Sequence, residues 1–212
     1  MAPSISPRGV APARRTFSAP SLIGLGHWAR VGKDSLARQL VVSHGFVQLA
    51  FADALRDLAV KVDPHLQEVL RACGGDWEVA KTRDPSVRVI LQRVGESARQ
   101  TLGRDVWVRG LERRLRLGGR YVISDVRYPE EAQMIRRRGG CLVEVRRPGV
   151  RAANGHASEH ALDEWRGWDA VVYNDGDVGG LAAAAAWIVE LGQGPLRWTA
   201  SEPPREFRCA SH

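Results

Sequence analysis

The feature that most constrains the fold is an alternation of short apolar runs with segments of helical periodicity. Runs typical of buried strands occupy residues 21–26, 47–51, 121–124, 141–145 and 170–173. Segments with apolar residues at helical spacing occupy 33–42, 53–62, 64–72, 85–102, 106–117, 129–138 and 181–191. Strands separated by helices form a parallel sheet covered on both faces, and such sheets bind ligands beyond the carboxyl ends of their strands. The pattern predicts an α/β domain with a five-stranded, mostly parallel sheet.

The two ends of the chain lack this pattern. Residues 1–20 and 193–212 are rich in Pro, Ser and Ala and carry no apolar periodicity, so both are expected to be disordered arms around one domain, residues 21–192. No apolar run approaches the ~20 residues that span a bilayer. The three cysteines show no CxxC or Cys/His ligand spacing. We therefore expect a cytoplasmic protein without a membrane partner, a disulfide framework or a zinc site.

The charge is positive and carried almost entirely by arginine. Basic residues outnumber acidic ones by 31 to 24, which gives a net charge of +7, and the only lysines are Lys33, Lys61 and Lys81. This balance admits nucleic acid, nucleotides or an anionic membrane as partners and selects none of them. Much of the excess lies in the arms, where Arg8, Arg14 and Arg15 have no acidic neighbour before residue 21.

The loop after the first strand carries the clearest chemical signal. Gly26-His-Trp-Ala-Arg-Val-Gly32-Lys33-Asp34-Ser35 joins a strand to a helix. Phosphate-binding loops use backbone N–H groups, a helix N-terminus and a lysine in this arrangement. The sequence departs from the common motif in having five residues between the glycines, and Asp34 stands where a hydroxyl residue is usual. If the four-residue spacing of the common motif is kept, the position of the first glycine falls on His27, which must then adopt the turn conformation of a glycine. The alternative is an ordinary connection with a chance Gly-Lys pair.

The end of the third strand gives a second signal. Tyr121-Val-Ile-Ser-Asp125-Val-Arg127 places a carboxylate and a guanidinium directly after a buried strand. In phosphoryl transfer such an acid can hold Mg²⁺, and the arginine can grip a phosphate. Asp125 can equally cap the next structural element, because Pro129 follows closely.

Weaker candidates lie elsewhere, each with a plain structural alternative. Asp53 can serve a site or cap a helix. Arg88 and Arg99 share a helix side and can reach one anion together or simply form a solvated face. The arginines after the fourth strand can belong to a mobile lid or to an exposed basic loop; they are Arg146, Arg147 and Arg151.

Taken in order, several segments resemble those of phage-type deoxynucleoside monophosphate kinases across about residues 21–192. They are GKDS, FADALR, LQRVGE, Trp107, SDVRYPEEA, the Gly-Gly pair, strand and Arg-Arg-Pro of residues 139–148, HASE, and VVYND. The resemblance implies a P-loop NTPase fold with a helical NMP-binding region at about 52–104 and a lid at about 147–160. It implies ATP-dependent phosphorylation of a deoxynucleoside monophosphate with Mg²⁺, in the host cytoplasm if the gene is carried by a phage.

The resemblance also implies roles for individual residues. The ATP phosphates and base would be held by Gly26, Arg30, Val31, Gly32, Lys33, Asp34, Ser35, Arg146 and Asn174. The acceptor would be bound by Asp53, Arg88, Arg99, Asp125, Arg127 and Glu159. Mg²⁺ would be held by Asp34, Ser35 and Asp125. The transferred group would be stabilised by Lys33, Arg127, Arg147 and Arg151.

Two other functions remain open at this level. The first is another small-metabolite P-loop kinase, such as one similar to dephospho-coenzyme A kinase, which would need a larger acceptor pocket. The second is a non-enzymatic nucleic-acid-binding protein that uses the arginine-rich stretches 104–120 and 136–151. Against the second, those stretches contain Asp105, Glu112 and Glu144, and no helix-turn-helix or zinc pattern appears. We expect no stable nucleic-acid partner; a homodimer is compatible with the resemblance, and the preferred base is not determined.

Overall fold

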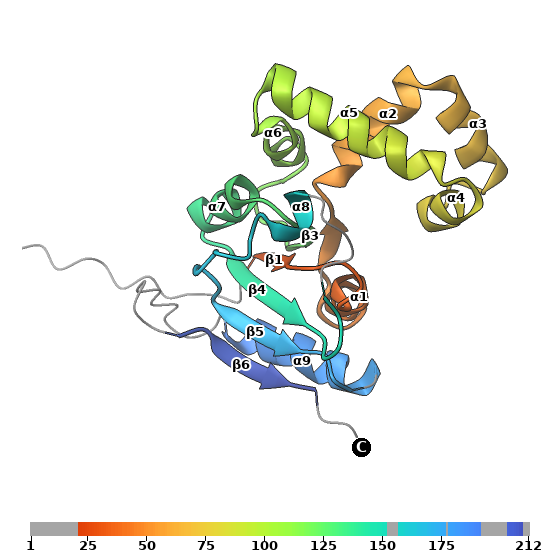
Figure 1. The fold of residues 1–212 in the computed structure, drawn as a ribbon. Coiled ribbons are helices and arrows are strands. Elements are labelled where there is room, and N and C mark those ends of the chain that lie inside the picture. The colour runs from red at the N-terminus through yellow and green to blue at the C-terminus, as the bar shows by residue number, and fades with distance from the viewer. Residues whose placement is uncertain (1–20, 152–156, 177, 192–202, 210–212) are drawn as a thin grey trace, which may run out of the picture.

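The computed structural model describes residues 21–151, 157–176, 178–191 and 203–209. Within them, six parallel strands form one sheet in the order β2-β3-β1-β4-β5-β6 (Figure 1). The strands are β1 (Leu22–Gly26), β2 (Val47–Leu49), β3 (Tyr121–Val126), β4 (Cys141–Arg146), β5 (Ala170–Tyr173) and β6 (Arg205–Arg208). The predicted α/β class with a parallel sheet is confirmed.

The sheet has one strand more than the sequence predicted. β6 pairs with β5 and lies inside 193–212, which was expected to be a disordered tail, so the domain extends past residue 192 to Cys209. An edge strand needs only one apolar face, and here Phe207 and Cys209 supply it against the core while charged residues alternate with them. No apolar run therefore marks the strand. The expected N-terminal arm at 1–20, part of the lid (152–156) and the rest of the tail lie outside the described residues.

β1 is the central strand, and this position fixes where ligands can bind. All five of its residues are buried, and Ile23 lies between Val122 of β3 and Cys141 of β4. After β1 the chain forms β2 and β3 on one side of that strand, and it later forms β4 on the other side. The carboxyl end of β1 is thus the switch point of the sheet, where crevices form in folds of this type.

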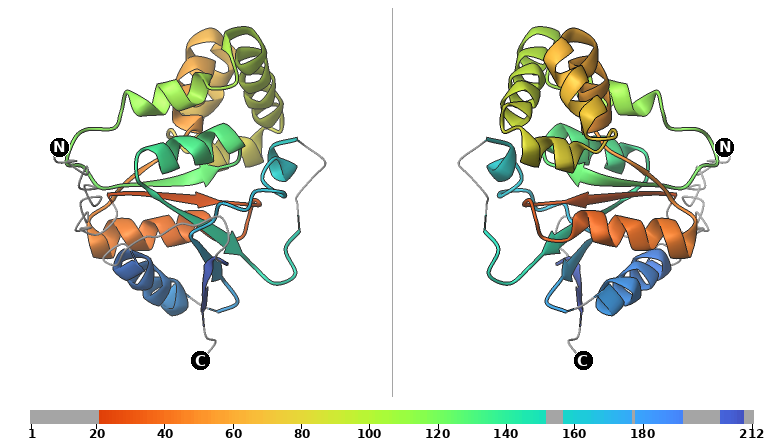
Figure 2. Two further views of the ribbon diagram at one scale, coloured as in Figure 1. Left: turned by 90° about the vertical axis from the view of Figure 1, so that its left-hand side faces the viewer. Right: turned by 90° about the vertical axis from the view of Figure 1, so that its right-hand side faces the viewer.

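Helices cover the two faces of the sheet unequally. α1 (Lys33–His44) and α9 (Val178–Leu191) pack on one face, with Leu36, Leu40 and Ile188 fully buried there. On the other face lie α6 (Val106–Glu112), α7 (Pro129–Arg137) and the segment 162–168, packed around Met134, which is also fully buried. Figure 2 shows these layers from two sides.

Four further helices form a group beyond the β2–β3 side of the sheet (Figures 1 and 2). They are α2 (Ala52–Val62), α3 (Pro64–Ala72), α4 (Trp77–Arg83) and α5 (Ser86–Leu102). Their apolar faces meet in a small core of their own around Ala59, Leu66 and Leu91. The sequence did not predict α4, which is only seven residues long and begins at an Asp76 carboxylate that accepts from two backbone N–H groups.

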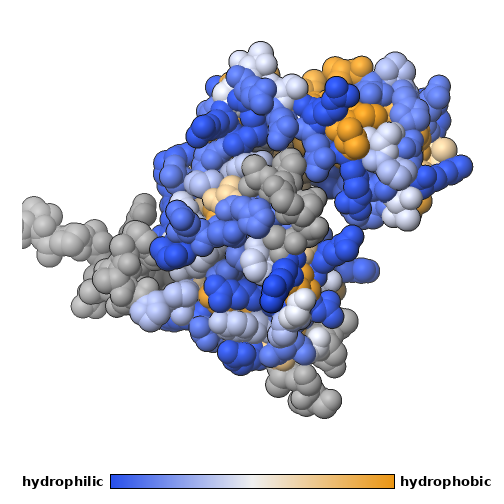
Figure 3. Space-filling model, in the orientation of Figure 1, coloured by the Kyte–Doolittle hydropathy of each residue, from blue (hydrophilic) through white to orange (hydrophobic). Residues whose placement is uncertain are grey.

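The surface is mostly hydrophilic, with apolar residues gathered over α5 and α2 (Figure 3). There Leu58, Val94 and Leu102 line an open hollow of about 400 Å³. None of the helices in the described residues has the length and apolar character needed to cross a bilayer.

Candidate active site

The loop between β1 and α1 has an unusual backbone. His27, Arg30 and Gly32 all have positive φ values, of 90°, 64° and 103°. A left-handed conformation costs a residue with a side chain about 1–2 kcal/mol, so two of them in one loop must be held by their surroundings. His27 adopts the glycine-like turn that the four-residue spacing requires. The loop ends at the N-terminus of α1, where backbone N–H groups favour an anion.

Gly32 is required at its position by space as well as by φ. A Cβ atom there would lie 2.3 Å from Nδ2 of Asn174. That amide donates a hydrogen bond of 2.9 Å to the carbonyl oxygen of Val31, and Asn174 is only 5% exposed. Asn174, which was expected near the donor base, thus has its side chain turned to the loop and braces it from β5.

Lys33 lies under the loop instead of pointing into solvent. The residue is 7% exposed, and its Nζ donates to the carbonyl oxygens of Trp28 and, at 3.0 Å, of His27. Burial and, to a lesser degree, the nearby Arg127 guanidinium lower the pKa of Lys33 to about 8. The side chain carries a cation to the inside of the loop, as a phosphate-binding lysine must.

The three residues expected to hold a metal differ in their surroundings. Asp34 and Ser35 are exposed on the first turn of α1, next to Lys33. Asp125 instead uses both carboxylate oxygens to accept from the N–H groups of Phe51, at 2.8 Å, and Ala52, at 2.9 Å. Asp125 therefore joins β3 to the start of α2. The sequence context suggested a cap for the following element near Pro129, but the carboxylate caps α2 instead, because β2 and β3 are neighbours in the sheet. Nowhere in the described part of the chain do three or more His, Cys, Asp or Glu side chains cluster as metal ligands.

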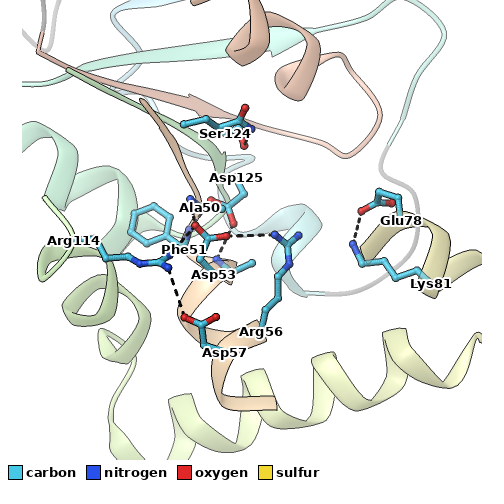
Figure 4. A network of polar contacts seen from close by, with 12 residues as sticks. Ala50, Phe51, Asp53, Arg56, Asp57, Glu78, Lys81, Arg114, Ser124 and Asp125 are labelled. Carbon is cyan, nitrogen blue, oxygen red and sulfur yellow. Dashed lines mark hydrogen bonds and ion pairs between the residues drawn. The ribbon is translucent and has the colours of Figure 1, made fainter. Parts of the chain in front are cut away.

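Asp53 also forms mainly structural contacts (Figure 4). Its Oδ2 accepts from the N–H of Ala50 at 3.0 Å and from Arg114 at 2.9 Å, and its Oδ1 lies 3.4 Å from Arg56. Arg114 also lies 3.6 Å from Asp57. This network attaches the first turn of α2 to the segment after α6.

Arg127, directly after β3, is linked to the loop between β1 and α1 through the side chain of Glu159. Its NH1 donates to Oε1 of Glu159 at 2.6 Å, and Glu159 Oε2 accepts from the N–H of Ala29 at 3.1 Å. α8 (Ala157–His160) supplies Glu159, which is 8% exposed. The structure thereby brings together the loop, the end of β3 and α8, three segments that the sequence placed far apart.

Arg99 and Arg88, which the sequence allowed either to reach one anion together or to form a solvated face, are separated. Eleven residues of helix place them about 16 Å apart along α5. Arg99 pairs with Glu130 at 2.6 Å and lies over the Tyr128 ring at 3.8 Å, next to Arg127. Arg88 is exposed at the other end, where it helps to lower the pKa of Glu78. A shared helix side does not bring these two side chains together, because about three turns of helix separate them along the axis.

The arginines after β4 lie on the opposite side of the loop. Arg146 forms two hydrogen bonds with Glu144, at 2.8 and 2.9 Å, while Arg147 and Arg151 are exposed. Arg146 and Arg147 line a cavity of about 790 Å³ beside the phosphate loop. Its other walls include His27, Trp28, Trp165, Trp168, Tyr173 and Arg208.

Two basic residues outside the predicted set of site residues, Arg56 and Lys81, lie on the helical side of the site. Lys81 pairs with Glu78 at 2.5 Å, and Figure 4 shows this pair on the same side of α2 as Arg56. The Lys81 hydrogen bond, with help from Arg88 and Arg56, holds the pKa of Glu78 below its usual range. The rarity of lysine could have drawn attention to Lys81, because it is one of only three lysines in the chain.

Comparison with known proteins agrees with this arrangement. The sequence profile of the family described as "Deoxynucleotide monophosphate kinase" matches residues 76–184, from α4 into α9. A protein of Acanthamoeba polyphaga mimivirus named "Putative deoxynucleotide monophosphate kinase" is 31% identical over 175 residues, which cover 73% of this chain and 88% of the relative. The chain therefore belongs to the deoxynucleotide monophosphate kinase family of P-loop proteins, and it is a phosphotransferase that acts on a nucleotide.

Proposed function

We propose that the protein transfers the γ-phosphoryl group of ATP to the 5′-phosphate of a deoxynucleoside monophosphate. The observation that carries this proposal is the loop of residues 27–32 with Lys33 buried beneath it at the N-terminus of α1. The matched family segment begins at residue 76, so this geometry argues for the donor site independently of the family match.

In the proposed step an oxygen of the acceptor phosphate attacks the γ-phosphorus in line. The bond to the bridging oxygen of the β-phosphate breaks, and ADP leaves with that electron pair. Both nucleotides are strongly anionic, so the protein must neutralise charge and fix the approach more than it must form bonds. Lys33 and the loop N–H groups serve the donor, and Arg127 serves the acceptor.

Mg²⁺ fits the start of α1. This ion is usually held by one or two protein oxygens together with phosphate oxygens and water. Asp34 and Ser35 offer such oxygens, exposed beside Lys33, whereas both oxygens of Asp125 already accept from backbone N–H groups. When bound, the ion would supply positive charge to the donor phosphates.

The acceptor would lie between β3 and the helices α2–α5, the NMP-binding region of about 52–104. Arg99 and Tyr128 adjoin Arg127 there, and Arg56 and Lys81 add positive charge from the helical side. Arg147 and Arg151 would approach the transferred group from the segment of about 147–160, which takes the role of a lid and excludes water.

The test is the removal of the Lys33 charge. Lys33→Met keeps much of the side-chain volume, and we expect it to lower kcat/KM for deoxynucleotide phosphorylation by about 100-fold or more, as when one preorganised donor is lost. Lys61→Ala is the matched control, because Lys61 is exposed on α2. Circular dichroism checks that both variants fold.

Retention of near-normal transfer by Lys33→Met would contradict the donor site. The same assay, run with each deoxynucleoside and ribonucleoside monophosphate and with dephospho-coenzyme A, identifies the acceptor. Turnover of dephospho-coenzyme A alone would contradict the proposed acceptor class.

A further inference from the structure

The carboxylate of Glu159 lies where an anionic ligand is expected. Its two oxygens have different partners: Oε2 accepts from the N–H of Ala29, in the middle of the phosphate loop, and Oε1 accepts from Arg127, at the end of β3. The side chain is 5% exposed. A single carboxylate thus bridges the element that serves the donor and the element that serves the acceptor.

These partners are typical of a phosphate site. A backbone N–H in a loop with positive φ values and a guanidinium are both preferred ligands of phosphate oxygens. Lys33 is close enough for the negative charge of Glu159 to favour its protonated form. Without an anion, Lys33 and Arg127 would repel each other in a partly buried space, and Glu159 offsets this repulsion.

We propose that Glu159 is an internal substitute for a substrate phosphoryl group. It fills the anion site between Ala29 and Arg127 in the nucleotide-free protein and withdraws when phosphates enter. This inference rests on the proposed function, because it takes the loop and Arg127 as the two sides of the transfer site. It also changes the expected role of Glu159, which competes with the substrate phosphates instead of binding the substrate.

The consequence is a lower affinity for every phosphate-bearing ligand. A ligand that must displace a bound group loses affinity by the fraction of molecules in which the site is open. A hydrogen bond to a charged group is stronger than one between neutral groups, so a neutral group in the same position should be displaced far more easily. Removal of the charge should therefore tighten the binding of simple anions.

The test measures binding of inorganic pyrophosphate by calorimetry at constant ionic strength. We expect Glu159→Gln, which is nearly the same size, to bind pyrophosphate about tenfold more tightly than the unaltered protein. Glu159→Ala should bind it at least as tightly. Equal or weaker binding by both variants would overturn the proposal and make Glu159 a structural or substrate-binding residue.

Asp163→Asn is the matched control. Asp163 lies four residues further on, where it accepts from Trp28 Nε1 at 3.4 Å and pairs with His160 at 2.8 Å. It anchors the same segment without touching Ala29 or Arg127. Its pyrophosphate affinity should be unchanged; an equal gain in Asp163→Asn would mean that loosening the segment is sufficient and would refute the role of the Glu159 carboxylate.

This experiment separates the inference from the proposed function. Pyrophosphate binding requires no acceptor and no turnover, whereas the Lys33→Met assay reads turnover alone. If the protein phosphorylates deoxynucleotides and Glu159→Gln gains no affinity, only the inference fails. If the affinity rises but no deoxynucleotide is phosphorylated, the proposed function fails by itself.

Discussion

Lys33 shows how a single residue joins the fold to the chemistry. A lysine held among loop carbonyls loses part of its hydration, and the pKa falls because the charged form is penalised. The side chain remains charged at neutral pH but not far above it. Phosphates entering the loop would restore a counter-charge and favour the proton again.

This shift predicts an alkaline limit for donor binding. As the pH rises through about 8, free protein loses the Lys33 proton, so kcat/KM for the nucleotide donor should decline toward tenfold per pH unit. The measurement is kcat/KM for the donor between pH 6.5 and 9.5. Lys33→Arg should have a lower plateau but no decline in that range, because a guanidinium keeps its proton. A flat profile for the unaltered protein to pH 9.5 would refute the role of the lysine charge.

At the scale of elements, the start of α7 depends on a buried acid. Oε2 of Glu131 accepts from the N–H groups of Arg127, at 2.7 Å, and Tyr128, at 3.0 Å, and so holds the turn that presents Arg127. Burial, with a smaller contribution from the charge of Asp125, raises the pKa of Glu131 to about 8. The sequence marked this helix by its proline and acids but gave no sign that one acid is buried.

The buried carboxyl of Glu131 should make the free energy of unfolding fall as the pH rises, and Glu131→Gln should remove this pH dependence. The folded state binds the Glu131 proton up to about pH 8 and the unfolded state only to about 4.5, so the stability that the acid contributes is lost as the pH rises between these values. An amide oxygen can accept the same two hydrogen bonds without a charge. We expect the free energy of unfolding of Glu131→Gln, measured in urea, to exceed that of the unaltered protein increasingly over this range, by at least about 1.4 kcal/mol at pH 8.

The control for this experiment is Glu68→Gln, on the exposed surface of α3. Its stability should follow that of the unaltered protein at every pH. If the curves for Glu131→Gln and the unaltered protein also run parallel from pH 4.5 to 8, Glu131 is already charged in the folded state.

For the whole molecule, β6 decides where the domain ends. Cys209 is 1% exposed in the core beneath α9, and Phe207 packs at 5.3 Å from the Trp187 ring. Arg208 lies 4.2 Å from the centre of the Tyr173 ring. The strand thus completes one edge of the sheet and a wall of the cavity beside the phosphate loop.

A chain that ends at Pro203 should be less stable than one that ends at Cys209. Loss of the strand removes two buried or partly buried apolar side chains, for a cost of at least about 2 kcal/mol, and exposes the edge of β5 to association. Urea unfolding measures the first effect and light scattering the second. Equal stability of the two chains would show that β6 adds nothing to the fold and that residues 203–209 behave as the tail first expected.

The sequence by itself determined the α/β class and the strand–loop–helix connection that carries Lys33. These follow from local patterns, because strand and helix periodicity and a Gly-Lys pair at a strand end are visible along the chain. The tertiary structure decided which residues contact one another at the site. Asp125 caps α2, Asn174 braces the loop at Gly32, and Glu159 reaches Ala29 because the parallel sheet brings distant strand ends to one edge. The edge strand β6 could also be recognised only in the tertiary structure, because its few apolar residues form a strand by pairing with β5 and packing against α9.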